Sequence, residues 1–255
     1  MTSPAKIESV SDLLSASWTM LSRFPGQPWW RGHAVASWRL VPSVLREDRG
    51  PIYEATIANK FAARAPSRYP NTPAKGDLAS WLFLMQHYGL PTRLLDWTES
   101  PLMAAYFAVS VEQNVAEGYA TEDGALWALD PFTMNGRTGG QEGLLQPGHA
   151  YAKNLVERAF TQGTAADPGV AAIVTEEIDL RMLVQMSGFT IHGNPTPLEV
   201  RPELDGLLAS FIIPAASKDR IRRELASLGV RERTVYPDLD HLARDLARDE
   251  YAELG

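Results

Sequence analysis

The feature that most constrains this chain is a run of polar side chains placed between two apolar helices. Residues 78–87 are predicted to form a buried helix, because their apolar side chains fall on one face. A second helix begins with Ser100 as its cap and Pro101 in its first turn, where proline loses no hydrogen bond. Between them, Gln86–Thr98 brings Gln, His, Tyr, Thr, Arg, Asp and Trp together. These side chains cannot all be solvated, so charged groups there must pair with one another or with a ligand.

Helical periodicity predicts further helices on both sides of this segment. The first is capped by Ser11 and buries Leu14, Trp18 and Leu21. The others are predicted at 52–65, 217–229 and 239–246, the second of them capped by Ser217. Extended patterns predict strands near 28–33, 124–130, 169–174, 188–192, 208–214 and 230–236. Residues 89–97 and 135–148 are predicted to be loops, the second because it contains five glycines.

The order of these elements indicates the fold class. Helices gather early in the chain and strands late, which favours an α+β fold over a doubly wound α/β one. We expect a central sheet, mixed or antiparallel, flanked by helices. The length of 255 residues allows one or two domains.

Composition excludes several classes of function. The net charge of −7 argues against a protein that binds polyanions over its whole surface. The absence of cysteine excludes disulfides, thiolate metal sites and a cysteine nucleophile. The five histidines have no zinc-site spacing, and neither a phosphate-binding loop of the Gly-x-x-x-x-Gly-Lys type nor a Gly-x-Ser-x-Gly elbow occurs. We therefore expect no bound metal.

No segment has the character of a membrane anchor or a signal peptide. The longest mostly apolar stretch, Leu102–Val111, is much shorter than the roughly 20 residues that a membrane helix needs. The first residues lead directly into the first predicted helix without an apolar core. We expect a cytoplasmic protein without membrane contacts.

Several motifs resemble the FRG domain, a family named after a Phe/Tyr-Arg-Gly triplet. The motifs are Trp30-Arg31-Gly32-His33, Leu40-x-Pro42-Ser43-x-Leu45-Arg46, Gln86-His87-Tyr88-Gly89-Leu90-Pro91-Thr92-Arg93-Leu94-Leu95-Asp96-Trp97-Thr98 and Ala105-x-Phe107-Ala108. The resemblance continues through Arg181-x-x-x-Gln185-x-x-Gly188-Phe189-Thr190 to Tyr236-Pro237-Asp238-Leu239. It implies a single domain over residues 1–255, with a motif-bearing part at 28–110 and a strand-rich part at 120–255.

The resemblance also implies an activity. FRG domains often occur in bacterial defence loci, which implies a toxin-type effector. The aromatic-Arg-Gly strand is similar to the first motif of ADP-ribosyltransferases of the arginine class, in which the strand arginine holds NAD. By this similarity the protein would use NAD as a substrate and transfer ADP-ribose to a nucleic acid or a protein, or hydrolyse NAD as a glycohydrolase. The fold would then be ADP-ribosyltransferase-like.

The candidate site residues follow from this similarity and from the chemistry of the bond to be broken. Cleavage of the nicotinamide glycosidic bond develops positive charge on the sugar, which calls for a polar or anionic partner. The forked guanidinium of Arg31 suits a diphosphate, and Gly32 would let the backbone approach it. The candidate catalytic residues are His87, Asp96 and Gln185, and the other candidate NAD-binding residues are Gln86, Thr92, Arg93, Thr98 and Thr190. Glu177 and Glu199 are candidates for an acceptor-side carboxylate outside this set.

Each of these residues also has a structural interpretation. Arg31 could simply pair with Asp96, and His87 could cap its helix. The basic run Arg220, Arg222, Arg223, Arg231 and Arg233 is either a solvated face or a guide for a nucleic-acid acceptor. A non-catalytic module that senses a nucleotide or binds a partner is therefore the alternative hypothesis, and a metal-dependent nuclease is a weaker one. One open cleft shared by Arg31, the segment 86–98 and the strand of Thr190 would favour the enzyme.

Overall fold

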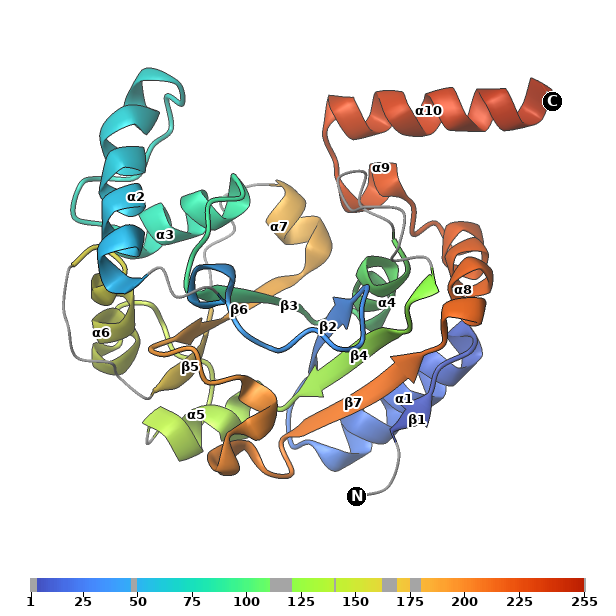
Figure 1. Cartoon of the computed structure of the whole chain (residues 1–255), viewed down its shortest axis with the longest axis horizontal. Helices are drawn as coiled ribbons and strands as arrows, with labels where there is room; N and C mark the ends of the chain where they lie inside the picture. The colour runs from blue at the N-terminus through green and yellow to red at the C-terminus, as the bar shows by residue number, and fades with distance from the viewer. Residues whose placement is uncertain are drawn as a thin grey trace.

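The fold is a seven-stranded mixed sheet flanked by helices (Figure 1), which confirms the predicted α+β class. A computed structural model describes residues 4–46, 50–110, 121–139, 141–161, 169–174 and 180–254. The strands are β1 (Ala5–Lys6), β2 (Trp29–His33), β3 (Leu94–Thr98), β4 (Gly124–Leu129), β5 (Val170–Ile173), β6 (Ser187–His192) and β7 (Leu208–Ile213). Their order in the sheet is β1-β7-β4-β2-β3-β6-β5, and neighbours are antiparallel except for the parallel pair β1 and β7.

Helices pack on both faces of this sheet, and the last one extends away from it (Figure 1). The helices are α1 (Val10–Arg23), α2 (Gly50–Arg64), α3 (Leu78–His87), α4 (Pro101–Val109), α5 (Pro131–Gly139), α6 (Ala150–Arg158), α7 (Leu180–Gln185), α8 (Ala215–Ser227), α9 (Glu232–Val235) and α10 (Leu239–Leu254).

The sheet opens in the middle, between β2 and β3. These two strands share a single paired position, Trp30 with Thr98. By contrast, β2 pairs with β4 through five positions and β3 pairs with β6 through five. Beyond Trp30 the backbones of β2 and β3 therefore separate, and polar groups that would otherwise form a ladder are left to find other partners.

Alternation along β2 places successive side chains on opposite faces of the sheet. Trp30 is buried on the face covered by α1, α4 and α8, where it stacks on Phe211 with ring centroids 6.1 Å apart. Gly32 faces the same way, and a Cβ atom there would lie 1.9 Å from the carbonyl oxygen of Ala104 in α4. The close packing of α4 against β2 therefore requires glycine at position 32.

Helices α2 and α3 form an arm beside the sheet, and a buried ion pair joins α2 to the start of β3. Arg93 donates from Nε to Glu54 Oε1 at 2.9 Å and from Nη2 to Glu54 Oε2. Both residues are less than 5% exposed. Bidentate geometry is the arrangement that best offsets the cost of burying two charges.

Two predicted loops and one predicted strand are wrong. Residues 89–97 include most of β3, whose Leu94, Leu95 and Trp97 are buried on both faces and so show no alternation. Residues 135–148 include the end of α5, which Asp130 starts by accepting hydrogen bonds from the amides of Phe132 and Thr133. The predicted strand at 230–236 contains the helix α9, and α6 was not predicted.

The first helix lies where it was predicted, but the face that it buries is not the predicted one. Its cap is Ser9 rather than Ser11, and its buried residues are Val10, Leu13, Ala16 and Met20. The predicted core residues Leu14, Trp18 and Leu21 are instead exposed, Trp18 by 71%. The helix carries two apolar stripes, and the smaller side chains are the ones that pack on the sheet. Similarly, α8 begins at Ala215 with Pro214 at the N-cap position, so Ser217 lies inside the helix and does not cap it.

Candidate functional site

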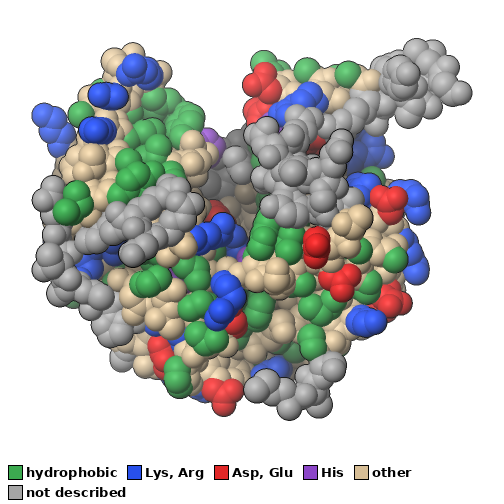
Figure 2. Space-filling view, viewed as in Figure 1, with side chains coloured by type: hydrophobic (Ala, Val, Ile, Leu, Met, Phe, Trp, Pro, Cys, Tyr) green, Lys and Arg blue, Asp and Glu red, His purple; other side chains and the backbone are tan. Residues whose placement is uncertain are grey.

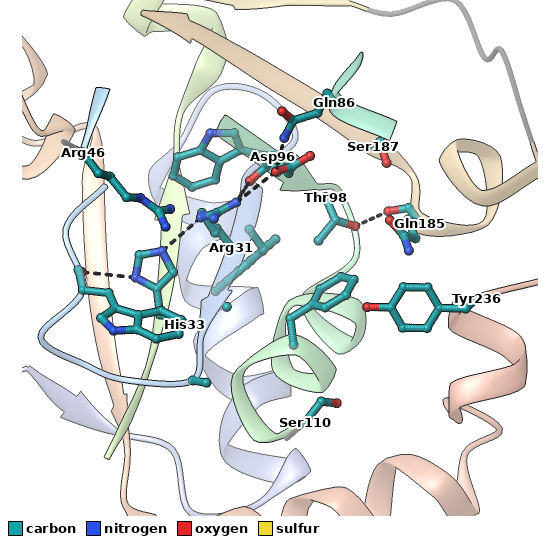
Figure 3. A pocket seen from close by; sticks show the side chains of 16 residues that line it. Arg31, His33, Arg46, Gln86, Asp96, Thr98, Ser110, Gln185, Ser187 and Tyr236 are labelled. Atoms are coloured by element: carbon teal, nitrogen blue, oxygen red, sulfur yellow. Dashed lines mark hydrogen bonds and ion pairs between the residues drawn. The ribbon is translucent and has the colours of Figure 1, made fainter. Parts of the chain in front are cut away.

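A cavity of about 310 Å³ opens where β2 and β3 separate (Figure 3). Its walls come from β2, β3 and the ends of α3, α4 and α7. The lining residues are Trp30, Arg31, Gly32, His33, Ala34, Trp38, Arg46, Gln86, Asp96, Trp97, Thr98, Phe107, Ser110, Gln185, Ser187 and Tyr236. The split in the sheet therefore produces a pocket of the size at which small-molecule sites begin.

Arg31 spans the gap between the two strands. Its Nη1 donates to the carbonyl oxygen of Asp96 at 2.6 Å and lies 3.7 Å from Asp96 Oδ2. Its Nε donates to His33 Nε2 at 3.0 Å. The guanidinium thus takes the place of the missing ladder hydrogen bonds, and its side chain remains 17% exposed to the cavity.

His33 accepts a hydrogen bond from Arg31 as a neutral imidazole. Because the Arg31 Nε–H can only donate, His33 Nε2 must carry no proton, and Nδ1–H then donates to the carbonyl of Trp38 at 3.2 Å. Burial, followed by the charges of Arg31 and Arg46, lowers the pKa of His33 to about 3. His33 therefore stays neutral throughout the physiological range and accepts rather than repels the guanidinium.

A second guanidinium, that of Arg46, points toward Arg31 and His33 (Figure 3). Its Nε donates to the carbonyl of Val41 at 2.9 Å, and its Nη groups have no hydrogen-bond partner among the described residues. Burial lowers the pKa of Arg46, and burial also lowers the pKa of Arg31 to about 10 despite the favourable charge of Asp96. Both groups stay cationic at neutral pH, so the cavity has two positive charges near one carboxylate.

That carboxylate, Asp96, is positioned by the polar segment of α3 and β3. The Thr92 hydroxyl donates to Gln86 Oε1 at 2.5 Å, and Gln86 Nε2 donates to Asp96 Oδ2 at 2.8 Å. This chain fixes the orientation of the Gln86 amide. The Asp96 side chain is 54% exposed, so its second oxygen is available to a bound molecule.

The opposite wall is formed by aromatic rings and by the end of α7. The Thr98 hydroxyl donates to the carbonyl of Gln185 at 2.6 Å, and Gln185 Nε2 donates to the carbonyl of Val235 at 3.1 Å. Phe107 and Tyr236 meet edge to face, with centroids 6.3 Å apart. Gln185 is the last residue of α7, and its hydrogen bond to Val235 ties α7 to α9.

The structure brings six of the candidate residues together and leaves four outside the cavity wall. Those in the wall are Arg31, Gly32, Gln86, Asp96, Thr98 and Gln185. Those outside it are His87, Thr92, Arg93 and Thr190. The strand of Thr190 therefore reaches the cavity only at its first residue, Ser187.

Each residue outside the wall has another partner. His87 meets Tyr88 edge to face at 4.9 Å, Thr92 supports Gln86, and Arg93 pairs with Glu54. Thr190 accepts a hydrogen bond from the Trp97 indole at 3.1 Å and lies 2.9 Å from His192 Nε2, in the core. Gly32 belongs to the wall, but its missing side chain makes room for α4 rather than for a ligand.

The remaining sequence candidates lie elsewhere. Glu199 pairs with Arg39 and accepts from the Leu40 amide, and it does not line the cavity. Glu177 lies outside the described residues. In the basic run, Arg220 pairs with Glu224 and Arg222 with Asp219.

Sequence reasoning missed the functional potential of His33, Arg46, Trp38, Phe107 and Tyr236. His33 had a signal, because alternation along a strand puts residues 31 and 33 on the same face. Arg46 and Tyr236 lie between regular elements. There, the sequence has no periodicity from which the direction of a side chain could be predicted.

In the described part of the chain, no group of three His, Asp or Glu side chains is arranged to hold a metal ion. None of the helices described combines the length and the apolar character required to cross a bilayer.

Fold and site together define an α+β protein with a cationic cleft in a split mixed sheet. Residues 26–117 match the sequence profile of the FRG domain, so this part of the chain is similar to that family. The matched region contains β2, α3, β3 and α4, and so most of the cavity wall, whereas Gln185, Ser187 and Tyr236 lie beyond it. Comparison with curated proteins and with solved structures gives no match.

Proposed function

We propose that the cavity binds NAD and that the protein cleaves its nicotinamide–ribose bond, transferring ADP-ribose to an acceptor or to water. One observation carries this proposal: Arg31 and Arg46 share the cleft with Asp96, the one carboxylate among the described lining residues. Two cations that line one cleft repel each other, and an anion bound between them relieves that repulsion. A diphosphate supplies that anion.

The geometry favours a forked anion over a point charge. Arg46 has its Nη donors unpaired within the described structure, and Arg31 is already oriented by His33 and by the Asp96 carbonyl. Guanidinium groups bind phosphate oxygens in pairs and with fixed direction. The aromatic wall of Phe107 and Tyr236 offers an apolar surface for a ring at the other side of the cavity.

The chemistry requires an anionic group near the ribose. When the bond from the sugar carbon to nitrogen breaks, the electron pair leaves with nicotinamide, which departs neutral, and positive charge develops on the ribose. The Asp96 carboxylate would stabilise that charge. A hydroxyl, amine or water of the acceptor then forms the new bond to the sugar carbon and loses its proton. Such a reaction suits a toxin-type effector in bacterial defence, the role that the FRG resemblance implies.

The test is nicotinamide release from NAD, measured chromatographically with and without DNA, RNA or cell lysate. Arg46→Gln and Asp96→Asn should each lower the rate at least tenfold, the first through NAD affinity and the second through turnover. Arg39→Gln is the matched control, because Arg39 is an exposed arginine outside the cavity wall. Absence of release under all conditions, or equal loss in Arg39→Gln, would contradict the proposal.

A non-catalytic nucleotide sensor is the second candidate. Asp96 is the one carboxylate in the described wall, and Gln86 and Arg31 already occupy part of its hydrogen-bonding capacity. A site without a free base suits binding better than turnover. Calorimetric binding of a nucleotide that is lost in Arg46→Gln, without any nicotinamide release, would favour the sensor.

A further inference from the structure

The arm formed by α2, α3 and their connection carries a concentrated positive charge. Between Ala55 and Gly76 there is no acidic residue, whereas Lys60, Arg64, Arg68 and Lys75 contribute four positive charges to a chain of net charge −7. All four are exposed. Figure 2 shows lysine and arginine side chains gathered at the tip of this arm.

Within the described part of the chain, no neighbouring carboxylate neutralises these charges. Within the described residues, none of the four has a carboxylate within ion-pair distance, and Arg68 donates to the carbonyl of Arg64 and the hydroxyl of Ser67. Lys60 and Arg64 are one turn apart, so they lie on the same side of α2. The basic run of α8 differs, because Asp219 and Glu224 pair with two of its arginines.

An exposed aromatic ring packs against the arm. Tyr88 is 55% exposed, although it contacts Tyr69 at 6.0 Å and Phe61 at 6.5 Å between ring centroids. Its neighbours hold the ring in place while part of its surface stays open. Tyr88 follows Gln86 by two residues, and Gln86 lines the cavity. Tyr88 is thus part of the surface of the basic arm and lies at the end of α3 that also carries Gln86.

We propose that this surface binds single-stranded nucleic acid, with phosphates on the arm and a base on Tyr88. An acidic protein would complement the positive charge of the arm, but it would offer no specific partner for the exposed ring of Tyr88. A base stacks on tyrosine whatever its identity, and unpaired lysine and arginine side chains release counterions when they meet phosphates. That the bound nucleic acid is also the acceptor for ADP-ribose rests on the function proposed above. The binding of the nucleic acid does not rest on it.

The test is fluorescence anisotropy with labelled 20-nucleotide DNA and RNA single strands in the absence of NAD. Arg64→Gln/Arg68→Gln should reduce the slope of log K against log salt by about 1.4, since each single-strand phosphate contact contributes about 0.7. Tyr88→Ala should weaken binding about fivefold or more, and Tyr88→Phe should not. Arg222→Gln/Arg223→Gln removes the same charge from α8 and should leave the slope unchanged.

Three outcomes would overturn the proposal: no binding by the wild-type protein, equal loss in the α8 variant, or binding of polyglutamate in preference to oligonucleotides. Arm-dependent binding without nicotinamide release in any condition would keep this proposal and remove the catalytic one. Nicotinamide release without oligonucleotide binding would do the reverse.

Discussion

Two arginines of this protein, Arg93 and Arg31, have opposite surroundings although both are paired with a carboxylate. Arg93 lies in the core and forms a bidentate pair with Glu54, and both side chains are about 5% exposed or less. Arg31 lies at the split between β2 and β3, paired with Asp96, whose side chain is 54% exposed. The first pair has no room for another molecule, whereas the second opens onto a cavity of about 310 Å³.

The difference teaches which part of the polar segment stabilises the fold and which part is available for function. A buried pair is costly to break, because the remaining charge is left without water or a partner. An exposed pair contributes little, because water replaces the lost partner. Side chains of the cleft are therefore free to serve a ligand, while those of the core are committed to joining α2 to β3.

The largest effect is expected from breaking the core pair. Arg93→Met leaves the Glu54 carboxylate buried without its partner and should destabilise the protein by about 3–5 kcal/mol in urea unfolding. Arg93→Met/Glu54→Leu removes both charges and should recover most of this loss. If the single variant unfolds as easily as the double variant, the pair does not have the role assigned to it.

The sequence alone could not separate these two arginines. Both lie in motifs that resemble the FRG domain, and both were predicted to bind NAD. What distinguishes them is Glu54, which lies 39 positions before Arg93 in another helix. Long-range pairing of this kind leaves no local pattern, so the burial of Arg93 could not be predicted.

Regular elements were predicted better where periodicity was present. The helices at 78–87 and from 101, and the strands at 124–130 and 208–214, correspond to observed elements because each has one buried face or a clear apolar run. β3 failed because both of its faces are buried, and α5 failed because buried contacts of Asn135 with β5 stabilise a glycine-containing helix. The polar segments that line the cavity were predicted. The presence of Arg46 and Tyr236 in its wall was not, because it depends on tertiary packing.

A second prediction concerns the backbone of the cleft. Gly32→Ala places a methyl group 1.9 Å from the Ala104 carbonyl oxygen if nothing moves. Such overpacking costs about 1–3 kcal/mol or more, measured by thermal or urea unfolding. Gly76→Ala is the control, because a Cβ atom there meets nothing within 4 Å. A Gly32→Ala protein as stable as the control would show that α4 yields easily, and the packing reason for glycine would fail.

A third prediction sharpens the contrast within the cleft, because the other partner of Arg31, His33, is buried. Its pKa is lowered from 6.5 to about 3 in the fold. Below pH 6.5, His33 is protonated in the unfolded chain but stays neutral in the native protein. The free energy of unfolding therefore decreases as the pH is lowered from 6.5 to about 3. Between pH 7.5 and 5.5 this histidine alone should cost about 1.4 kcal/mol.

The measurement is urea unfolding of wild type and His33→Gln at pH 7.5 and 5.5. The variant should lose about 1.4 kcal/mol less stability over this interval than wild type does. His241→Gln, which removes an imidazole outside the cavity wall, serves as the comparison. An unchanged pH dependence in His33→Gln would mean that His33 is protonated in the native protein and cannot accept from Arg31.

The smallest effect on stability is expected from Asp96→Asn, and it separates a structural pair from a functional one. The Asp96 side chain is 54% exposed, and the Arg31 Nη1 hydrogen bond goes to the Asp96 backbone carbonyl, which the substitution retains. Unfolding free energy should therefore change by less than about 1 kcal/mol, while Gln86 can still donate to the new amide oxygen. A loss above about 3 kcal/mol would place Asp96 with Glu54 as a structural carboxylate. A stable variant that has lost ligand binding or turnover would instead show that the carboxylate acts on the occupant of the cleft.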